Sequence, residues 1–320
     1  MIRISFTEPA SRGHFEVAPA QLQPGFITDM TASLSDSIRG GDGAKGAITS
    51  VLTAPARSTD AGEQRARYSL VVSSDTEHRI AAQRLRYGVF ANEPGFRIPD
   101  NGTGLDADRF DDHCDHMLVR DDLTEEFVGC YRMLPPDKVA AAGGYYTATE
   151  FELSQLDPTG RRIVEMGRAC VVPEHRNGSV LTLMWAGILH YIQLTGYDWV
   201  MGCASVPMQD TPADAPGVNV RGVRDLLLGR HASDPEHRVR PYRPVVVDGK
   251  TLDEMTPPAR PKLPPLLRGY LRLGAEICGE PAHDPDFAVA DFVVLLGLDT
   301  INTRYLERLQ GAAANFDGGR

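Results

Sequence analysis

The chain has 320 residues, of which 42% are hydrophobic and 24% are charged, as expected of a soluble globular protein with one large or two ordinary domains. Its net charge of -10 argues against nucleic acid as the main partner. The sequence has no run near the roughly 18–20 apolar residues that span a bilayer, no apolar secretory signal, and five cysteines without regular spacing. These features predict a cytoplasmic protein with reduced thiols.

The first 64 residues are rich in small and polar side chains and include the glycine-rich loop signal at Arg39–Ala44. We expect residues 1–64 to form a weakly ordered N-terminal arm, residues 65–310 a single domain, and residues 311–320 a C-terminal tail. The domain begins with a predicted strand, Tyr68–Val72. A helix is predicted from about Glu77 to Asn92, with Ala81, Leu85 and Val89 in one stripe.

The middle of the chain predicts strands that pair locally and then a crossover. His116–Arg120 and Phe127–Leu134 read as two strands separated by an acidic turn. Ile163–Val172 is almost wholly apolar and is predicted to be a central strand. A helix follows over Ser179–Thr195, with Gly196 as its stop signal.

The last third predicts a strand at Tyr197–Ala204, a long Pro- and Arg-rich stretch, a helix at Leu266–Gly274 and a late strand at Phe292–Leu296. Locally paired strands followed by a strand–turn–helix–strand unit indicate an α/β fold. We therefore predict a central mixed, twisted sheet flanked by helices.

Charge is unevenly distributed. Between Asn219 and Arg272 there are eleven Lys or Arg residues against six Asp or Glu residues. Such a basic region suits an acidic partner protein or an anionic membrane surface, but a solvated surface explains it equally well. The predicted helix with Arg268 and Arg272 is either an amphipathic contact for a membrane or carrier protein, or a packed helix.

The turn between the central strand and the next helix is a candidate anion site. A helix N-terminus presents free backbone N–H groups and a positive dipole end, which favour a phosphate. An ordinary strand-to-helix loop is the alternative. The residues of this candidate anion site are Val171, Val172, His175, Arg176, Asn177, Gly178 and Ser179.

This strand, turn and apolar helix resemble the acyl-donor segment of GNAT acyltransferases. The family usually has Gln or Arg, two residues, Gly, one residue, and Gly or Ala; here those positions hold His175, Gly178 and Val180. The resemblance implies the GNAT fold and a donor that carries a pantetheine arm. The departure at Val180 favours the 4'-phosphopantetheine arm of acyl carrier protein over coenzyme A, with no permanently bound cofactor.

A narrower resemblance, from Glu77 to about Leu309, is to the ornithine N-acyltransferases that make lyso-ornithine lipid. More distantly, the chain is similar to the acyl-homoserine-lactone synthases through Arg86, Phe90, Asp108, Asp111, Arg132, Glu165 and Arg168. Where the narrower family usually has Trp, after Pro281, this chain has Ala282 and His283. The matching segments are Gln83–Phe90, Asp108–His116, Gly129–Leu134, Glu165–Val171, Arg176–Gly178, Gly202–Pro207, Leu263–Tyr270, Cys278–Pro281 and Asp291–Phe292.

Amine attack on a thioester requires a base, because an amino-acid α-amine is mostly protonated at neutral pH. The resemblance implies that Glu165 is this base, with Arg168 beside it as the second catalytic residue. Strict strand alternation puts the two on opposite faces. A β-bulge at Gly167 is expected to bring them to one face. The alternative is a structural Glu–Arg ion pair.

The resemblance also implies residues for the acceptor amino acid. Asp108 and Asp111 are candidates for its ammonium group, and Arg86, Arg132 or Arg168 for its carboxylate, where a planar two-pronged donor fits well. For each of them an internal salt bridge is the alternative, and Asp108 also suits a turn cap.

Other candidate residues are better explained by the core. The run His113–His116 has no second ligand pair at a zinc-like spacing, so no metal is expected. Cys170 and Cys203 lie in apolar strands and are expected to be small core residues rather than nucleophiles. Phe90 is more typical of the core than of a ligand contact.

Together these observations predict an acyl-carrier-protein-dependent N-acyltransferase that transfers a fatty acyl group, with 3-hydroxyacyl favoured, to the amine of ornithine or a similar amino acid. Two alternatives stay open: an enzyme that makes a signal or natural product from another amine, and a non-catalytic haemolysin-like protein. The predicted location is the cytoplasm, with peripheral contact to the inner face of the membrane left open.

Overall fold

A ten-stranded mixed sheet forms the centre of the protein in the computed structural model, which describes residues 5–6, 50–54, 67–94, 96, 102–156, 161–176, 178–302 and 304. The strand order is β1-β2-β3-β4-β5-β7-β8-β14-β12, and β13 also pairs with β14. Neighbouring strands are antiparallel except β7 and β8, which are parallel. The strands are β1 Ser5–Phe6, β2 Ser50–Ala54, β3 Tyr68–Ser73, β4 Asp115–Asp121, β5 Glu126–Leu134, β7 Ile163–Val171, β8 Trp199–Pro207, β12 Glu276–Ile277, β13 Ala282–Asp284 and β14 Val289–Gly297.

Two small antiparallel sheets of two strands each accompany the main sheet: β6 (Phe151–Glu152) with β9 (Arg240–Pro241), and β10 (Val246–Val247) with β11 (Lys250–Thr251). None of the described helices is long and apolar enough to cross a membrane. The α-helices are α2 Thr76–Phe90, α3 Val139–Ala142, α4 Ser179–Thr195, α5 Val218–Arg230 and α6 Pro265–Leu273; the short 3-10 helices are η1 Asp111–His113, η2 Thr147–Thr149, η3 Pro173–His175, η4 Pro235–His237, η5 Leu252–Glu254 and η6 Leu298–Thr300.

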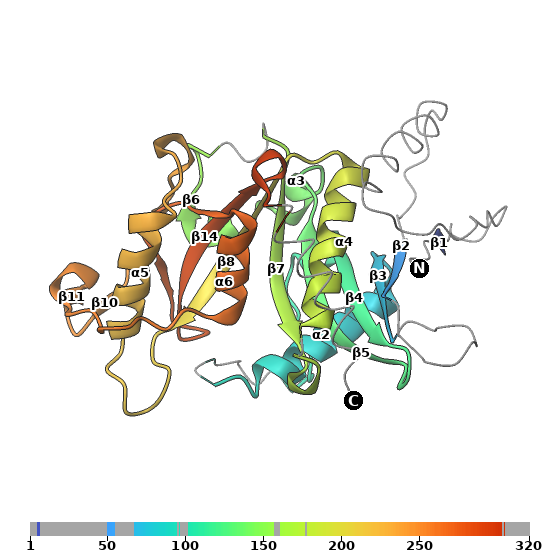
Figure 1. Cartoon of the computed structure of the whole chain (residues 1–320), viewed down its shortest axis with the longest axis horizontal. Helices are drawn as coiled ribbons and strands as arrows, with labels where there is room; N and C mark the ends of the chain where they lie inside the picture. Colours follow the sequence, from blue (N-terminus) through green and yellow to red (C-terminus); the bar gives the residue numbers. More distant parts are fainter. Residues whose placement is uncertain are drawn as a thin grey trace.

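Helices cover both faces of the sheet (Figure 1). On one face, α4 packs across β3, β4 and β5, and α6 packs against β14. On the other face, α2 contacts β4, β5 and β7. The predicted apolar stripe of α4 is confirmed, because Met184, Trp185, Ile188 and Ile192 are all buried in the main core. The helix ends at Gly196 as expected.

The sequence-based elements from β3 onward are confirmed with shifts of one to three residues at their ends. The longest element that the sequence analysis missed is α5, which falls in the stretch expected to be an irregular Pro- and Arg-rich connection; the short elements α3, β6 and β9–β13 were also not predicted. Val220, Val223 and Leu227 have helical spacing and are fully buried. The arginines and prolines around them obscured that pattern. From the predicted N-terminal arm, the structure describes β1 and β2, which pair at the edge of the sheet next to β3; the other arm residues lie outside the described residues.

Candidate active site

A cavity of about 730 Å³ opens where β7 and β8 separate. The two strands pair in parallel only from Ile163 to Glu165 on β7 and from Trp199 to Met201 on β8. Beyond that point residues of both strands line the cavity. At the start of the separation a Cβ on Gly202 would lie 2.1 Å from the Met166 carbonyl oxygen, so only glycine allows this approach. The volume is in the range of ordinary ligand sites.

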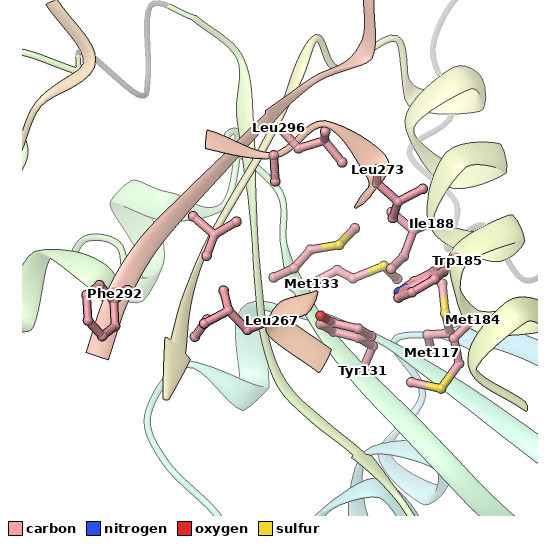
Figure 2. Packing of buried hydrophobic residues seen from close by; sticks show 14 of the residues in the cluster. Met117, Tyr131, Met133, Met184, Trp185, Ile188, Leu267, Leu273, Phe292 and Leu296 are labelled. Carbon is pink, nitrogen blue, oxygen red and sulfur yellow. The ribbon is translucent and has the colours of Figure 1, made fainter. Parts of the chain in front are cut away.

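One end of the cavity is apolar. Its walls come from α4, α6 and β14, with Trp185 of α4 facing Leu267 of α6 and Leu296 of β14 nearby (Figure 2). Helix α6 approaches α4 closely at Gly269, where a Cβ would lie 2.3 Å from the Trp185 ring. The predicted helix of Leu266–Gly274 therefore forms a packed wall of the cavity, which is one of the two interpretations that its sequence allowed.

A β-bulge on β7 aims Arg168 into the polar end of the cavity. Arg132 of β5 pairs with Gly167, and Cys130 pairs with Cys170, so two β7 residues oppose one β5 residue. The first of the two, Arg168, has a left-handed backbone with φ +53, which is uncommon for a residue other than glycine. The bulge was expected at Gly167. That position was wrong by one residue, because the pairing is regular through Gly167.

The bulge nevertheless has the predicted consequence for the two candidate catalytic residues. Glu165 and Arg168 both line the cavity, and Arg132 lies close to each of them. The positive charge of Arg132 favours the ionised form of Glu165, and Arg132 and Arg168 both donate hydrogen bonds to Asp108. Both side chains are therefore on one face of β7. They do not form the ion pair that was the alternative; each has other partners.

The Glu165 carboxylate is buried and holds the loop that contains η2. Its Oε2 accepts a hydrogen bond from the Tyr146 backbone N–H at 2.7 Å. Its Oε1 accepts from the Thr147 backbone N–H at 2.7 Å and from the Thr147 hydroxyl at 2.6 Å. Burial raises the pKa of Glu165, and these hydrogen bonds oppose the increase. The side chain thus fixes Tyr146 and Thr147, which also line the cavity.

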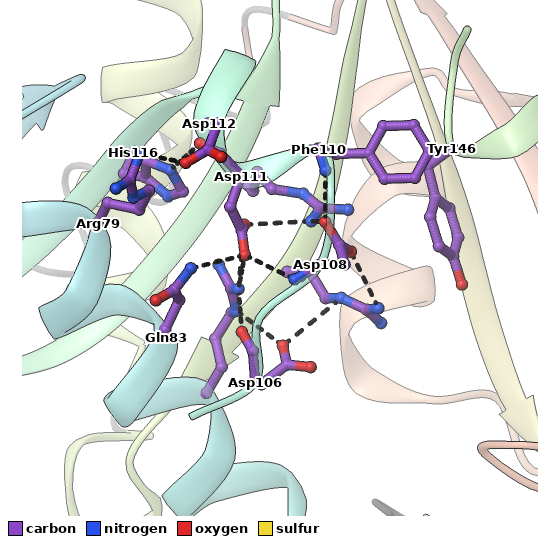
Figure 3. Close-up of polar contacts among 12 residues, drawn as sticks. Arg79, Gln83, Asp106, Asp108, Phe110, Asp111, Asp112, His116 and Tyr146 are labelled. Carbon is purple, nitrogen blue, oxygen red and sulfur yellow. Dashed lines mark hydrogen bonds and ion pairs between the residues drawn. The ribbon is translucent and has the colours of Figure 1, made fainter. Parts of the chain in front are cut away.

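Three aspartates and three arginines form a buried network beside the bulge (Figure 3). It consists of Asp106, Asp108 and Asp111 with Arg86, Arg132 and Arg168. Arg132 donates a hydrogen bond of 2.6 Å to Asp108. Asp111 accepts from Arg86 at 2.9 Å and from Gln83 at 3.0 Å. Equal numbers of carboxylates and guanidiniums leave the network electrically balanced.

The network determines the pKa values of its carboxyl groups. Burial alone would raise the pKa of Asp111, but Arg86 and Arg132 outweigh it and hold the pKa far below its usual range. The pKa of Asp108 is also lowered, since Arg132 more than offsets burial. Asp108 in addition accepts the Phe110 backbone N–H at 2.9 Å, the turn cap considered from the sequence.

The network also corrects part of the predicted acceptor site. Arg86 and Asp111 are 1% and 2% exposed, bind each other, and do not line the cavity. They belong to the scaffold, because a buried guanidinium with several carboxylate partners has no free donor fork for a substrate. Arg132, Arg168 and Phe90 do line the cavity. Asp108 lies behind them and holds both arginines.

The predicted donor turn borders the same cavity. Val171, His175, Arg176 and Gly178 line it, and Gly178 directly precedes the first turn of α4. Arg176 is ion-paired with Glu93. Of the other residues expected to bind the donor, Val172 and Ser179 are not among the lining residues, and Asn177 lies outside the described residues.

Sequence reasoning missed an acidic cluster at the polar end of the cavity, formed by Glu150, Asp284 and Asp291. Asp291 lies in a segment that carried the family resemblance, but nothing in its immediate sequence distinguished it from a core strand residue. Among the described residues these three are the group with ligand atoms close enough together to hold an ion. The run His113–His116 forms no such group, and His116 instead contacts the Asp111 carbonyl oxygen at 3.1 Å.

The cysteines near the cavity have the properties of core residues. Burial raises the pKa of the Cys203 thiol well above its usual value. Cys170 faces Cys130 at 3.5 Å between the sulfur atoms, and the pKa of Cys170 is also raised well above its usual value, by this contact and by burial. Protonated thiols are poor nucleophiles, so neither cysteine is suited to carry the acyl group.

Known proteins resemble this chain in sequence and fold. Residues 85–186 match the acetyltransferase (GNAT) domain family. An L-ornithine N(alpha)-acyltransferase of Rhizobium meliloti is 33% identical over 90% of this chain and 98% of its own length. The enzyme of the same name from Brucella abortus is 33% identical over 73% of this chain and 85% of its own.

Among solved structures, an N-acyl amino acid synthase from uncultured soil microbes superposes with a TM-score of 0.42 at 13% identity, covering 73% of this chain and 92% of its own. The mixed sheet, the separation of β7 from β8 and the flanking helices agree with the GNAT domain found in the sequence. The chain is therefore a GNAT-fold N-acyltransferase and belongs to the L-ornithine N(alpha)-acyltransferase family.

Proposed function

We propose that the protein transfers a fatty acyl group, preferentially 3-hydroxyacyl, from acyl carrier protein to the α-amine of ornithine or a similar amino acid, which gives an N-acyl amino acid (lyso-ornithine lipid). One observation carries the proposal: Glu165, Arg168 and Gly178 line a single cavity that continues into an apolar channel. The names of the curated relatives support ornithine as the acceptor.

The separation between β7 and β8 suits an extended donor arm. Past Glu165, β7 has no paired neighbour on its β8 side in the described part of the chain, so the arm can lie along it with the Gly178 turn near its phosphate. The thioester then lies close to the bulge, and the acyl chain enters the channel between α4 and α6. Burial of that chain supplies binding energy in proportion to its apolar area.

Transfer in this site is direct. The α-amine nitrogen attacks the thioester carbonyl carbon, a C–N bond forms through a tetrahedral intermediate, and the C–S bond breaks. The pantetheine sulfur leaves as a thiol, and the ammonium form of the acceptor loses two protons, one to the departing sulfur and one to solvent. Arg168, held by Asp106 and Asp108, is placed to bind the acceptor's carboxylate.

Glu165 is our candidate for the base that removes the first of these protons, directly or through a water molecule. A base normally contributes about 10²–10⁴-fold to the rate. Glu165→Gln should therefore lower kcat by at least about 100-fold and leave carrier-protein binding nearly unchanged. Because Glu165 also holds the η2 loop, Thr147→Ala is the matched control: it removes one hydrogen bond to the carboxylate and keeps the carboxylate itself. Equal losses in both variants would assign Glu165 to loop positioning alone.

The function itself is tested by incubating the purified protein with 3-hydroxyacyl and unsubstituted acyl carrier proteins, with acyl-coenzyme A, and with a panel of amino acids. Mass spectrometry identifies the products. We expect N-acylornithine from the carrier-protein donors. A product with a different amine would support the signal or natural-product alternative, and no product from any donor would contradict the assignment.

A further inference from the structure

Three carboxylates converge at the polar end of the cavity from separate parts of the chain. Glu150 follows η2, Asp284 ends β13 and Asp291 lies in β14. Their oxygen atoms lie within 4.8 Å of one another. Asp284 and Asp291 line the cavity. Asp291 is 3% exposed and accepts a 2.6 Å hydrogen bond from Ser205 on the neighbouring strand β8.

Within the described part of the chain the three carboxylates form no ion pair with an arginine or lysine. Neither oxygen of Glu150 has exposed surface or a hydrogen bond of normal geometry there, although Tyr146 and Asp291 lie close enough to act on its charge. Arg168, which lines the same cavity, is paired with Asp106 and Asp108; its charge favours ionised Asp291, but burial outweighs it. Burial, reinforced by the neighbouring carboxylates, raises the pKa of Glu150 to about 9 and that of Asp291 to about 6. Buried carboxylates without a partner destabilise a fold, and such groups in a cleft are typical of binding sites.

The place of the cluster in the cavity indicates which cation it receives. Glu150, Asp291 and Glu165 all act on the Cys203 thiol of β8, so the cluster lies near Glu165, and Asp284 and Asp291 line the same cavity as Glu165 and Arg168. The apolar end is occupied by the acyl chain in the proposed function. A diamino acid acylated at its α-amine retains a charged side-chain amine, because such an amine has a pKa near 10.4. A compact ammonium with three N–H donors matches three convergent carboxylates.

We propose that Glu150, Asp284 and Asp291 bind the side-chain ammonium group of a diamino-acid acceptor and thereby select a basic amino acid over a neutral one. This inference rests on the proposed acyl transfer. It adds the group that determines acceptor specificity: the two amines of the substrate are distinguished because one is held in the acidic cluster while the other reaches the thioester.

Acceptor competition tests the inference. Ornithine is compared with norvaline, which has the same carbon skeleton without the side-chain amine, using one acyl donor. We expect the wild-type protein to favour ornithine in kcat/KM by at least about 100-fold, since a site built for a polar group rejects the analogue that lacks it. Asp291→Asn and Glu150→Gln should each raise the KM for ornithine at least about tenfold and leave the kcat/KM for norvaline unchanged. Glu152→Gln, which changes a partly exposed carboxylate two residues further along, in β6, is the matched control.

Equal losses for ornithine and norvaline in the cluster variants would overturn the inference, as would wild-type protein that does not distinguish the two acceptors. Recognition of ornithine that disappears with EDTA and returns with Mg²⁺ would identify a metal site and overturn it too. Calorimetric binding of ornithine and norvaline to the same proteins, without donor, separates the inference from the proposed function. If no acyl transfer occurs, loss of ornithine binding in Asp291→Asn still supports the cluster, and undiminished binding refutes it.

Discussion

Two groups of three buried or partly buried carboxylates lie near the same cavity, and they differ in their counterions. Asp106, Asp108 and Asp111 face three arginines, and their contacts form a closed network. Glu150, Asp284 and Asp291 form no ion pair with an arginine or lysine among the described residues, and the one guanidinium that acts on them, that of Arg168 on Asp291, does not offset burial. Burial raises the pKa in both groups, but only in the first do arginines outweigh it: the pKa of Asp111 is far below its usual range, whereas that of Glu150 is raised to about 9.

This difference in counterions distinguishes a network that stabilises the fold from a cluster proposed to bind a ligand. A balanced network stabilises the fold while its fully buried members are present, because removal of one of them, such as Asp111, leaves an uncompensated buried charge. An unbalanced cluster destabilises the free protein and becomes favourable when a cation arrives. Arg168 joins the two regions, since its ion pairs belong to the network while its guanidinium lies between the Tyr146 and Phe287 rings at the cavity.

The largest expected effect is in the balanced network. Asp111→Asn removes the shared partner of Arg86 and Arg132, and we expect a loss of about 3–5 kcal/mol in the free energy of unfolding. Denaturant titration measures this. Asp112→Asn is the matched control. It removes an ion pair between Arg79 and Asp112, whose side chain is 68% exposed. The free energy of unfolding should fall by less than about 1 kcal/mol. Similar losses in both variants would mean that the network is not the stabilising feature described above.

Arg168 is expected to show the second largest effect, on catalysis rather than stability. Arg168→Met should lower kcat/KM for the acceptor by about 100-fold, mainly through KM, because a two-pronged carboxylate ligand is lost. Arg168→Lys keeps the charge but not the planar fork, so it should recover only part of the loss. Thermal unfolding should change little, since both ion pairs of Arg168 are long, at 3.4 and 3.5 Å. A loss of stability as large as that in Asp111→Asn would place Arg168 in the scaffold instead.

Sequence patterns and the family resemblance located most residues of the balanced region but none of the interactions of the unbalanced one. The strand β7, its turn and α4 follow from apolar runs, from the stop at Gly196 and from the family resemblance, and Asp108, Arg132 and Arg168 come with them. The structure gives Arg86 and Asp111 a different role, because burial is a property of packing that the local sequence does not contain. The bulge was inferred from Gly167, whereas Arg168 adopts the left-handed backbone.

The acidic cluster could not be predicted from the sequence, and the reason is physical. Glu150 and Asp291 are 141 positions apart, and the β13–β14 register together with the Glu165 hydrogen bonds to the η2 loop brings their surroundings together. No local sequence pattern indicates that Glu150 and Asp291 lie close together in the fold. Helix α5 was missed for a different reason: its buried valines have helical spacing, but arginines and prolines dominate the composition of the segment.

The smallest expected effect is on the pH dependence of stability, which should have opposite signs for Glu150 and Asp111. The pKa of Glu150 is raised from 4.5 to about 9, so the folded protein binds more protons than the unfolded chain between these values. Stability from this group is therefore full at low pH and falls as the pH rises toward 9. For Asp111, whose pKa is lowered, stability is present above the unfolded pKa and falls only in acid.

Glu150→Gln removes the fall in stability toward pH 9 that Glu150 causes, and it keeps the shape of the side chain. The variant should unfold at a temperature about 3 °C higher than the wild type at pH 8.5, and the gain should shrink toward zero near pH 5. Calorimetric melting at both pH values measures the difference, with Glu152→Gln expected to show no gain at either. A gain of equal size at both pH values would mean that packing, rather than an unbalanced charge, distinguishes the cluster, and a loss at pH 8.5 would mean that the Glu150 carboxylate already has a partner.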